Sequence, residues 1–138
     1  MKQSSAEDKN TKEPTRSELE ILQVLWTYGP SPVRFVMDEI NRFRELNYTA
    51  TLKLMQLMVD KGILKRDESK MQHIYYPAED EKKVKAQLLD KFLSAVYNGS
   101  ASSLMIQLAQ NRKTSKEDLK KMKDILARLE KEEKGKQK

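Results

Sequence analysis

The sequence predicts a mainly α-helical chain with one β-hairpin. Apolar residues recur at helical spacing in six separate segments, and several of these segments begin at a Ser or Thr that can cap a helix. The spacing changes only once, in two short β-prone runs over residues 63–66 and 73–76, with the turn-like residues 67–70 between them. This order of elements predicts a winged helix-turn-helix followed by three further helices.

The first predicted helix begins at Thr15. Thr15 and Glu18 have the spacing of a capping box, in which each side chain accepts a hydrogen bond from the backbone N–H of the other residue. Gly29 and Pro30 end this helix. Ser31 is the expected N-cap of the second helix, with Pro32 in its first turn. The second helix buries an apolar face made of Val33, Val36, Met37 and Ile40.

The third predicted helix runs over residues 49–61 and ends at Gly62. Thr49, Lys53, Gln56 and Asp60 have spacings that place them on one narrow polar stripe. Apolar residues fill much of the remaining surface, so this helix should be anchored on one side and exposed along the stripe. The hairpin that follows is the wing, and one of its adjacent tyrosines, Tyr75 or Tyr76, should face the core.

Three helices follow the wing, over residues 80–97, 100–110 and from a cap at Ser115. Each has an apolar face but together they form a weak core, so we expect burial against a second copy of the chain. The predicted domains are a disordered tail (1–14), a winged-helix DNA-binding domain (15–78), a helical dimerisation domain (79–130) and a second disordered tail (131–138). The predicted dimer contacts are Leu88, Phe92, Val96, Leu104, Leu108, Leu119, Met122, Leu126 and Leu129.

Composition excludes most catalytic chemistry. The 138 residues include no Cys and one His, which leaves no thiolate metal site, Cys nucleophile or histidine cluster. The four Gly are too scattered to form a phosphate-binding loop. We expect no enzyme activity, catalytic residue, metal or cofactor. No apolar run approaches the roughly 20 residues of a membrane span, and the first residues lack a signal-peptide stretch, so we expect a cytoplasmic protein without membrane insertion.

The charge balance points to nucleic acid as the first candidate partner. The formal net charge is +6, and a basic excess without catalytic residues favours binding to double-stranded DNA. The excess is uneven, with +1 over residues 1–78 and +5 over residues 79–138. Nonspecific DNA affinity should therefore be modest and steeply dependent on salt.

The predicted DNA contacts follow from the helix-turn-helix order. The polar stripe of the third helix would enter the major groove, where Gln reads adenine and Lys reaches guanine or a phosphate. Residues at the start of the third helix and at the end of the second helix would contact phosphates. Cations of the wing would reach the DNA backbone or the minor groove. The predicted contacts are Arg42, Arg44, Asn47, Tyr48, Thr49, Lys53, Gln56, Lys65, Arg66 and Lys70.

Two alternatives remain open at this point. Winged helices also serve as protein-interaction adaptors, and an exposed apolar patch on the first domain would favour that function over DNA binding. A small ligand could instead bind in a pocket at a dimer junction.

The residues also resemble a known family. The run over residues 48–58 and Lys61–Gly62–Ile63–Leu64 resembles the recognition helix and following strand of the penicillinase-repressor family (the BlaI/MecI/CopY type). The segments over 66–69, 73–77 and 103–109 and the opening helix over 15–26 are also similar, so the resemblance covers nearly all of residues 15–130.

This resemblance implies a bacterial homodimeric transcriptional repressor that binds an inverted-repeat operator. In the antibiotic-responsive branch, a membrane metallopeptidase senses the antibiotic, and the repressor is then cleaved within its dimerisation helices. The bond cleaved there, Asn-Phe, aligns with Gln107–Leu108, which marks a candidate cleavage region of different sequence. Leu57 stands where the family often has Arg, and the C-terminal cysteines of the copper-responsive branch are absent. The operator sequence, the regulated genes and the inducing signal stay undetermined.

Overall fold

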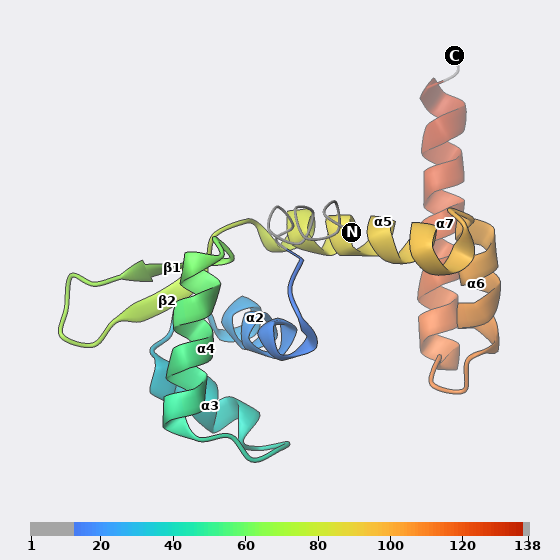
Figure 1. The fold of residues 1–138 in the computed structure, drawn as a ribbon. Coiled ribbons are helices and arrows are strands. Elements are labelled where there is room, and N and C mark those ends of the chain that lie inside the picture. Colours follow the sequence, from blue (N-terminus) through green and yellow to red (C-terminus); the bar gives the residue numbers. More distant parts are fainter. Residues whose placement is uncertain (1–12, 137–138) are drawn as a thin grey trace, which may run out of the picture. The chain divides into compact units, whose positions relative to one another are not determined.

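The computed structural model describes residues 13–136 and confirms a mainly α fold with one antiparallel hairpin (Figure 1). Residues up to Leu88 form one unit, and Leu89 onward forms the second. The predicted N-terminal tail lies, up to residue 12, outside the described residues. The elements are α2 (Arg16–Tyr28), α3 (Val33–Ile40), α4 (Tyr48–Asp60), β1 (Leu64–Asp67), β2 (Ile74–Pro77), α5 (Glu81–Tyr97), α6 (Ala101–Gln110) and α7 (Lys116–Lys136).

The predicted capping box at the start of α2 is confirmed. The Glu18 N–H donates to Thr15 Oγ1 at 3.2 Å, and the Thr15 N–H donates to Glu18 Oε1 at 2.9 Å. The helix ends at Gly29, whose φ of +89° lies in the region that side chains with a Cβ rarely adopt. Both ends of α2 are therefore determined by residues within one turn of them.

The core of the first unit lies among α2, α3, α4 and the hairpin. These elements pack directly on one another, and each contributes side chains that are removed from water. The burial of such apolar surface is the main force that holds the unit together. The predicted apolar face of α3 is confirmed. The core consists of Ile21, Leu22, Val24, Leu25, Val33, Val36, Ile40, Met55, Met58, Ile63, Leu64 and Tyr75.

The start of α3 differs from the prediction. Pro32 is the N-cap residue, and no side chain caps this helix. Ser31 instead forms a β-bridge with Tyr75, through backbone bonds of 3.0 and 2.8 Å, and its hydroxyl donates to the Gly29 carbonyl at 2.8 Å. The predicted Ser31 cap is wrong because the wing recruits the backbone of Ser31, an interaction between residues 44 positions apart.

The wing is a two-stranded antiparallel sheet in which Leu64 pairs with Pro77 and Asp67 with Ile74. Side chains alternate between the two faces of a strand. Tyr75 accordingly lies in the core and is only 1% exposed, whereas Tyr76 remains half-buried. The prediction that one of the two tyrosines faces the core is confirmed.

An ion pair joins the start of α2 to the end of α4. Lys61 Nζ lies 2.8 and 3.0 Å from the two carboxylate oxygens of Glu18. The Glu18 side chain is 4% exposed and the Lys61 side chain 40% exposed. Glu18 therefore has two roles, since it completes the capping box and holds the C-terminal end of α4 against α2.

The first unit extends beyond residue 78, where the sequence predicts the end of the DNA-binding domain. The first unit extends to Leu88, so it contains the first turns of α5. Lys85 places its ammonium 5.1 Å from the centre of the Trp26 ring, and the Ala78 N–H donates to the Ile63 carbonyl at 2.9 Å. These contacts attach the start of α5 to the first unit, so the division falls within the helix.

The second unit contains no buried side chain among its described residues. Asn98 and Gly99 both have positive φ and make the turn from α5 to α6, and the Ser100 hydroxyl caps α6 by accepting from the Ser103 N–H at 3.1 Å. The sequence predicts a tail from residue 131, and α7 continues to Lys136. The spacing of Glu130 and Lys134 favours such a helix without an apolar face.

Candidate DNA-binding interface

The polar stripe of α4 has the predicted exposure. Thr49, Lys53 and Gln56 are all exposed, whereas Met55 and Met58 on the other side are fully buried. Lys53 forms no ion pair with any carboxylate among the described residues. The structure therefore brings the predicted groove-facing residues together on a helix whose opposite side is fixed in the core. Leu57, 48% exposed, lies on the open side as well.

The N-terminal turn of α4 offers free backbone donors. Asn47 is the N-cap, and its side-chain oxygen accepts from the Ala50 N–H at 2.8 Å. The N–H groups of Tyr48 and Thr49, at the first two helical positions, have no acceptor within the helix because none lies one turn earlier. Unpaired donors and the helix dipole favour an anion here. Asn47 retains its amide N–H groups for such a contact, since its oxygen is used by the cap.

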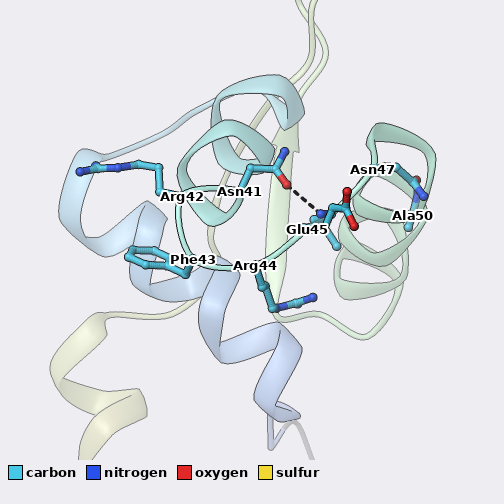
Figure 2. Close-up of a pocket in the computed structure, with 8 residues that line it drawn as sticks. Asn41, Arg42, Phe43, Arg44, Glu45, Asn47 and Ala50 are labelled. Atoms are coloured by element: carbon cyan, nitrogen blue, oxygen red, sulfur yellow. Dashed lines mark hydrogen bonds between the residues drawn. The ribbon is translucent and has the colours of Figure 1, made fainter.

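The turn between α3 and α4 borders a shallow pocket that is open to solvent (Figure 2). Asn41 stabilises this turn, because its side-chain oxygen accepts from the Leu46 N–H at 2.7 Å. Phe43 points outward and is 82% exposed. A single exposed phenyl ring is common on protein surfaces and does not make an apolar patch. The pocket is lined by Asn41, Arg42, Phe43, Arg44, Glu45, Leu46, Asn47 and Ala50.

The two arginines of this turn are engaged by carboxylates. Arg42 lies 3.1 Å from Glu39, one turn earlier in the sequence. Arg44 forms a forked pair with Glu20 of α2, with N–O distances of 2.6 to 3.2 Å. Hydrogen bonding to Arg44 lowers the pKa of Glu20, and the same bond raises the pKa of Arg44. Arg44 therefore connects the turn to α2, a role that the sequence did not indicate.

The basic residues of the wing differ in whether they lie near a carboxylate. Arg66 donates to Glu68 at 2.6 Å and lies 5.9 Å from the centre of the Tyr75 ring, and hydrogen bonds to Tyr75 and Glu68 raise its pKa. Hydrogen bonds from Ser69 lower the pKa of Asp67, and the nearby charge of Lys70 lowers it further. Lys65 is exposed and has no ion pair with the described carboxylates.

The sequence analysis missed Arg34. This exposed residue of the first turn of α3 places its guanidinium carbon 5.6 Å from the centre of the Tyr48 ring. The distance is typical of a cation–π contact. Arg34 thus lies beside the N-terminal turn of α4, and no periodicity could have revealed this because the two residues belong to different helices.

The predicted dimerisation residues lie on α5, α6 and α7. Leu88, Leu104 and Met122 are half-buried, and the remaining six are exposed. Further exposed apolar side chains, Leu89, Ile106 and Ile125, were not among the predicted contacts. The candidate cleavage residues Gln107 and Leu108 lie in the last turn of α6 and are also exposed.

Comparison with known proteins gives the family. The sequence profile described as penicillinase repressor matches residues 14–128. The chain belongs to the penicillinase-repressor family. Members of this family are transcriptional repressors and not enzymes. Among the described residues, no helix is long and apolar enough to cross a membrane, and no cluster of His, Asp or Glu could hold a metal ion.

Individual relatives of this repressor-family chain are distant but match along most of their length. A penicillinase repressor of Staphylococcus aureus is 23% identical over 114 residues, which span 83% of this chain and 90% of the relative. The methicillin resistance regulatory protein MecI of Mammaliicoccus sciuri is 22% identical over 119 residues, or 86% and 97% of the two chains. A penicillinase repressor of Bacillus licheniformis is 23% identical over 110 residues, or 80% and 86%.

Proposed function

We propose that this repressor binds, as a homodimer, an inverted-repeat operator whose major groove receives α4. The observation that carries this proposal is the exposed stripe of Thr49, Lys53 and Gln56 on a helix anchored by buried methionines. The major groove is about 12 Å wide and admits one α-helix. A helix that projects polar donors from one face and packs by the other can therefore read base edges while the core holds it in place.

The division between free and engaged cations supports distinct roles around α4. Lys53 and Lys65 form no ion pair with the described carboxylates, so each can contact DNA without first breaking such a pair. The amides of Tyr48 and Thr49 would contact a phosphate at the start of α4, as helix N-termini commonly do. Arg42, Arg44, Arg66 and Lys70 are neighbours of acidic groups, so we assign Arg44 to holding the turn and the other three to backbone contacts that require partial rearrangement.

Dimerisation is supported by the lack of a core in the second unit. Three helices without one buried side chain among their described residues cannot offset the conformational entropy lost on ordering them. On α7, Leu119, Met122, Leu126 and Leu129 follow a 3-4-3 spacing and form one apolar stripe. We propose that a second copy of the chain covers this stripe. The two-fold symmetry would then place the half-sites about one helical turn, or a multiple of it, apart.

The direct test is selection of a binding site. Wild-type protein is incubated with duplexes that contain a randomised region of about three helical turns, and bound sequences are amplified and sequenced. Enrichment of an inverted repeat, bound by two protomers, supports the proposal. Failure to enrich any sequence, together with equally weak and salt-sensitive binding to all duplexes, contradicts it and favours the protein-interaction adaptor.

The groove assignment predicts a loss of discrimination. Gln56→Ala and Lys53→Ala should each reduce the ratio of specific to nonspecific affinity by about 5- to 100-fold, because a good base contact contributes about 1–3 kcal/mol of discrimination. Fluorescence anisotropy with the selected and a scrambled duplex measures this ratio. Gln23→Ala, on an exposed part of α2, is the matched control. If both α4 variants discriminate as wild type does, α4 does not read the bases.

Release by proteolysis is the proposed route of derepression, with a membrane metallopeptidase as the candidate sensor. A cut at Gln107–Leu108 would separate the DNA-binding unit from the stripe on α7. Replacing these residues with the recognition sequence of a specific protease allows this to be tested. We expect cleavage to yield monomers and to weaken operator binding by at least 100-fold, since linked sites gain roughly 10²–10⁴ in avidity. A cleaved protein that remains dimeric and bound would exclude this mechanism.

A further inference from the structure

We infer that Arg34 and Tyr48 form a phosphate clamp beside the recognition helix, in which Arg34 contacts a backbone phosphate and Tyr48 positions its guanidinium. This inference rests on the proposed insertion of α4 into the major groove. It assigns a DNA contact to α3, the helix that precedes the turn.

The geometry of the pair supports pre-positioning. The guanidinium carbon of Arg34 lies 5.6 Å from the centre of the Tyr48 ring. Tyr48 is the first residue of α4 and is 43% exposed, and Arg34 is exposed as well. An aromatic ring attracts the face of a guanidinium but leaves its N–H groups at the edge free to donate. The contact therefore restricts the motion of Arg34, and no described residue accepts a hydrogen bond from its guanidinium.

The charges around Arg34 distinguish it from the other arginines of the first unit. Arg42, Arg44 and Arg66 each lie within 3.2 Å of a glutamate, and Arg16 is close enough to Glu20 to lower the pKa of that residue. Arg34 forms no ion pair with any described carboxylate, although Asp38 lies one turn later on α3. Its positive charge is thus available to an external anion at no cost of breaking an internal pair.

The surroundings of Arg34 favour a phosphate over a base edge. The free amides of Tyr48 and Thr49 begin α4 next to it, and such amides with an arginine fork suit the oxygens of a phosphate. The stripe that faces the groove begins at Thr49 and continues through Lys53 and Gln56, further along α4. Arg34 belongs to the neighbouring helix and flanks that stripe, which is the usual place for contacts that orient a protein on DNA.

A salt titration of DNA binding tests the clamp. Wild type and Arg34→Ala are compared by fluorescence anisotropy on the selected operator and on a scrambled duplex of equal length. We expect Arg34→Ala to weaken binding to both duplexes by a similar factor, about 5- to 10-fold per DNA-binding unit. The magnitude of the negative slope of log K against log salt should fall by about one per DNA-binding unit. The ratio of specific to nonspecific affinity should stay near the wild-type value.

Three substitutions within the clamp and one control outside it separate the contributions of the two residues. Arg34→Lys should have the wild-type salt slope but only part of the wild-type affinity. It keeps the positive charge but loses the paired N–H donors of the guanidinium. Tyr48→Leu should weaken binding more in the wild-type background than in Arg34→Ala, whereas Tyr48→Phe keeps the ring and should preserve this coupling. Arg112→Ala, an equal change of charge on the second unit, should leave binding nearly unchanged.

The outcomes distinguish failure of the clamp from failure of the proposed function. Specific operator binding by wild type, with Arg34→Ala identical in affinity and slope, overturns the clamp alone. A large fall in the specificity ratio of Arg34→Ala also overturns it, since a phosphate contact carries no base discrimination. Absence of specific binding by wild type rejects the proposed function, and the clamp with it.

Discussion

If the chain dimerises through α7 as proposed, Leu126→Asp is expected to yield monomers and to reduce affinity for the selected operator by at least 100-fold. Leu126 lies in the middle of the apolar stripe of α7 and is 49% exposed in one protomer. A carboxylate at this position would be desolvated in the dimer interface without a partner, which is among the largest penalties a single side chain can impose. The loss of affinity follows because two linked DNA-binding units gain roughly 10²–10⁴ in avidity, which separate units lack.

Sedimentation analysis and anisotropy on the selected operator measure these two effects. Ala127→Asp is the matched control, because it adds the same charge one residue along α7 and so on a different side of the helix. The single tryptophan, Trp26, lies in the first unit, and its fluorescence reports whether that unit remains folded. A Leu126→Asp protein that is still dimeric and binds as wild type would show that the stripe is not the interface.

Lys61→Met is expected to lower the free energy of unfolding by about 3 kcal/mol, because it leaves the Glu18 carboxylate buried without its cation. The Glu18 side chain is 4% exposed, and after the change the Thr15 N–H is its remaining hydrogen-bond donor among the described residues. The pair joins α2 to the end of α4, so the destabilisation should include the anchoring of α4. Urea unfolding at one fixed protomer concentration measures it.

A double variant tests the cause of this destabilisation. Glu18→Gln combined with Lys61→Met removes the unpaired charge and retains an oxygen that can accept from Thr15, so it should recover most of the lost stability. Lys53→Met, at an exposed lysine of the same region without an ion pair, should change stability by less than about 0.5 kcal/mol. If Lys61→Met is as stable as this control, the pair behaves as a solvent-exposed one and does not anchor α4.

The local signals of the sequence predicted most of the fold. The capping box of Thr15 and Glu18, the end of α2 at Gly29 and the exposed stripe of α4 depend on interactions within one or two turns of a helix. Spacing along the chain is sufficient to reveal such interactions. The prediction for Ser31 was wrong although its local pattern is a good cap, because a backbone bridge to Tyr75 replaced that role.

By itself, the sequence determined where helices and the hairpin form, which faces are apolar, and which polar residues share the stripe of α4. Tertiary structure alone decided which charged and aromatic side chains that are distant in the sequence come into contact. Arg44 pairs with Glu20 across 24 residues, Lys61 with Glu18 across 43, and Arg34 rests on Tyr48 of another helix. The reason is physical: the period of a helix places neighbours on one element, but the partner of a long charged side chain depends on which surfaces the packed core brings together.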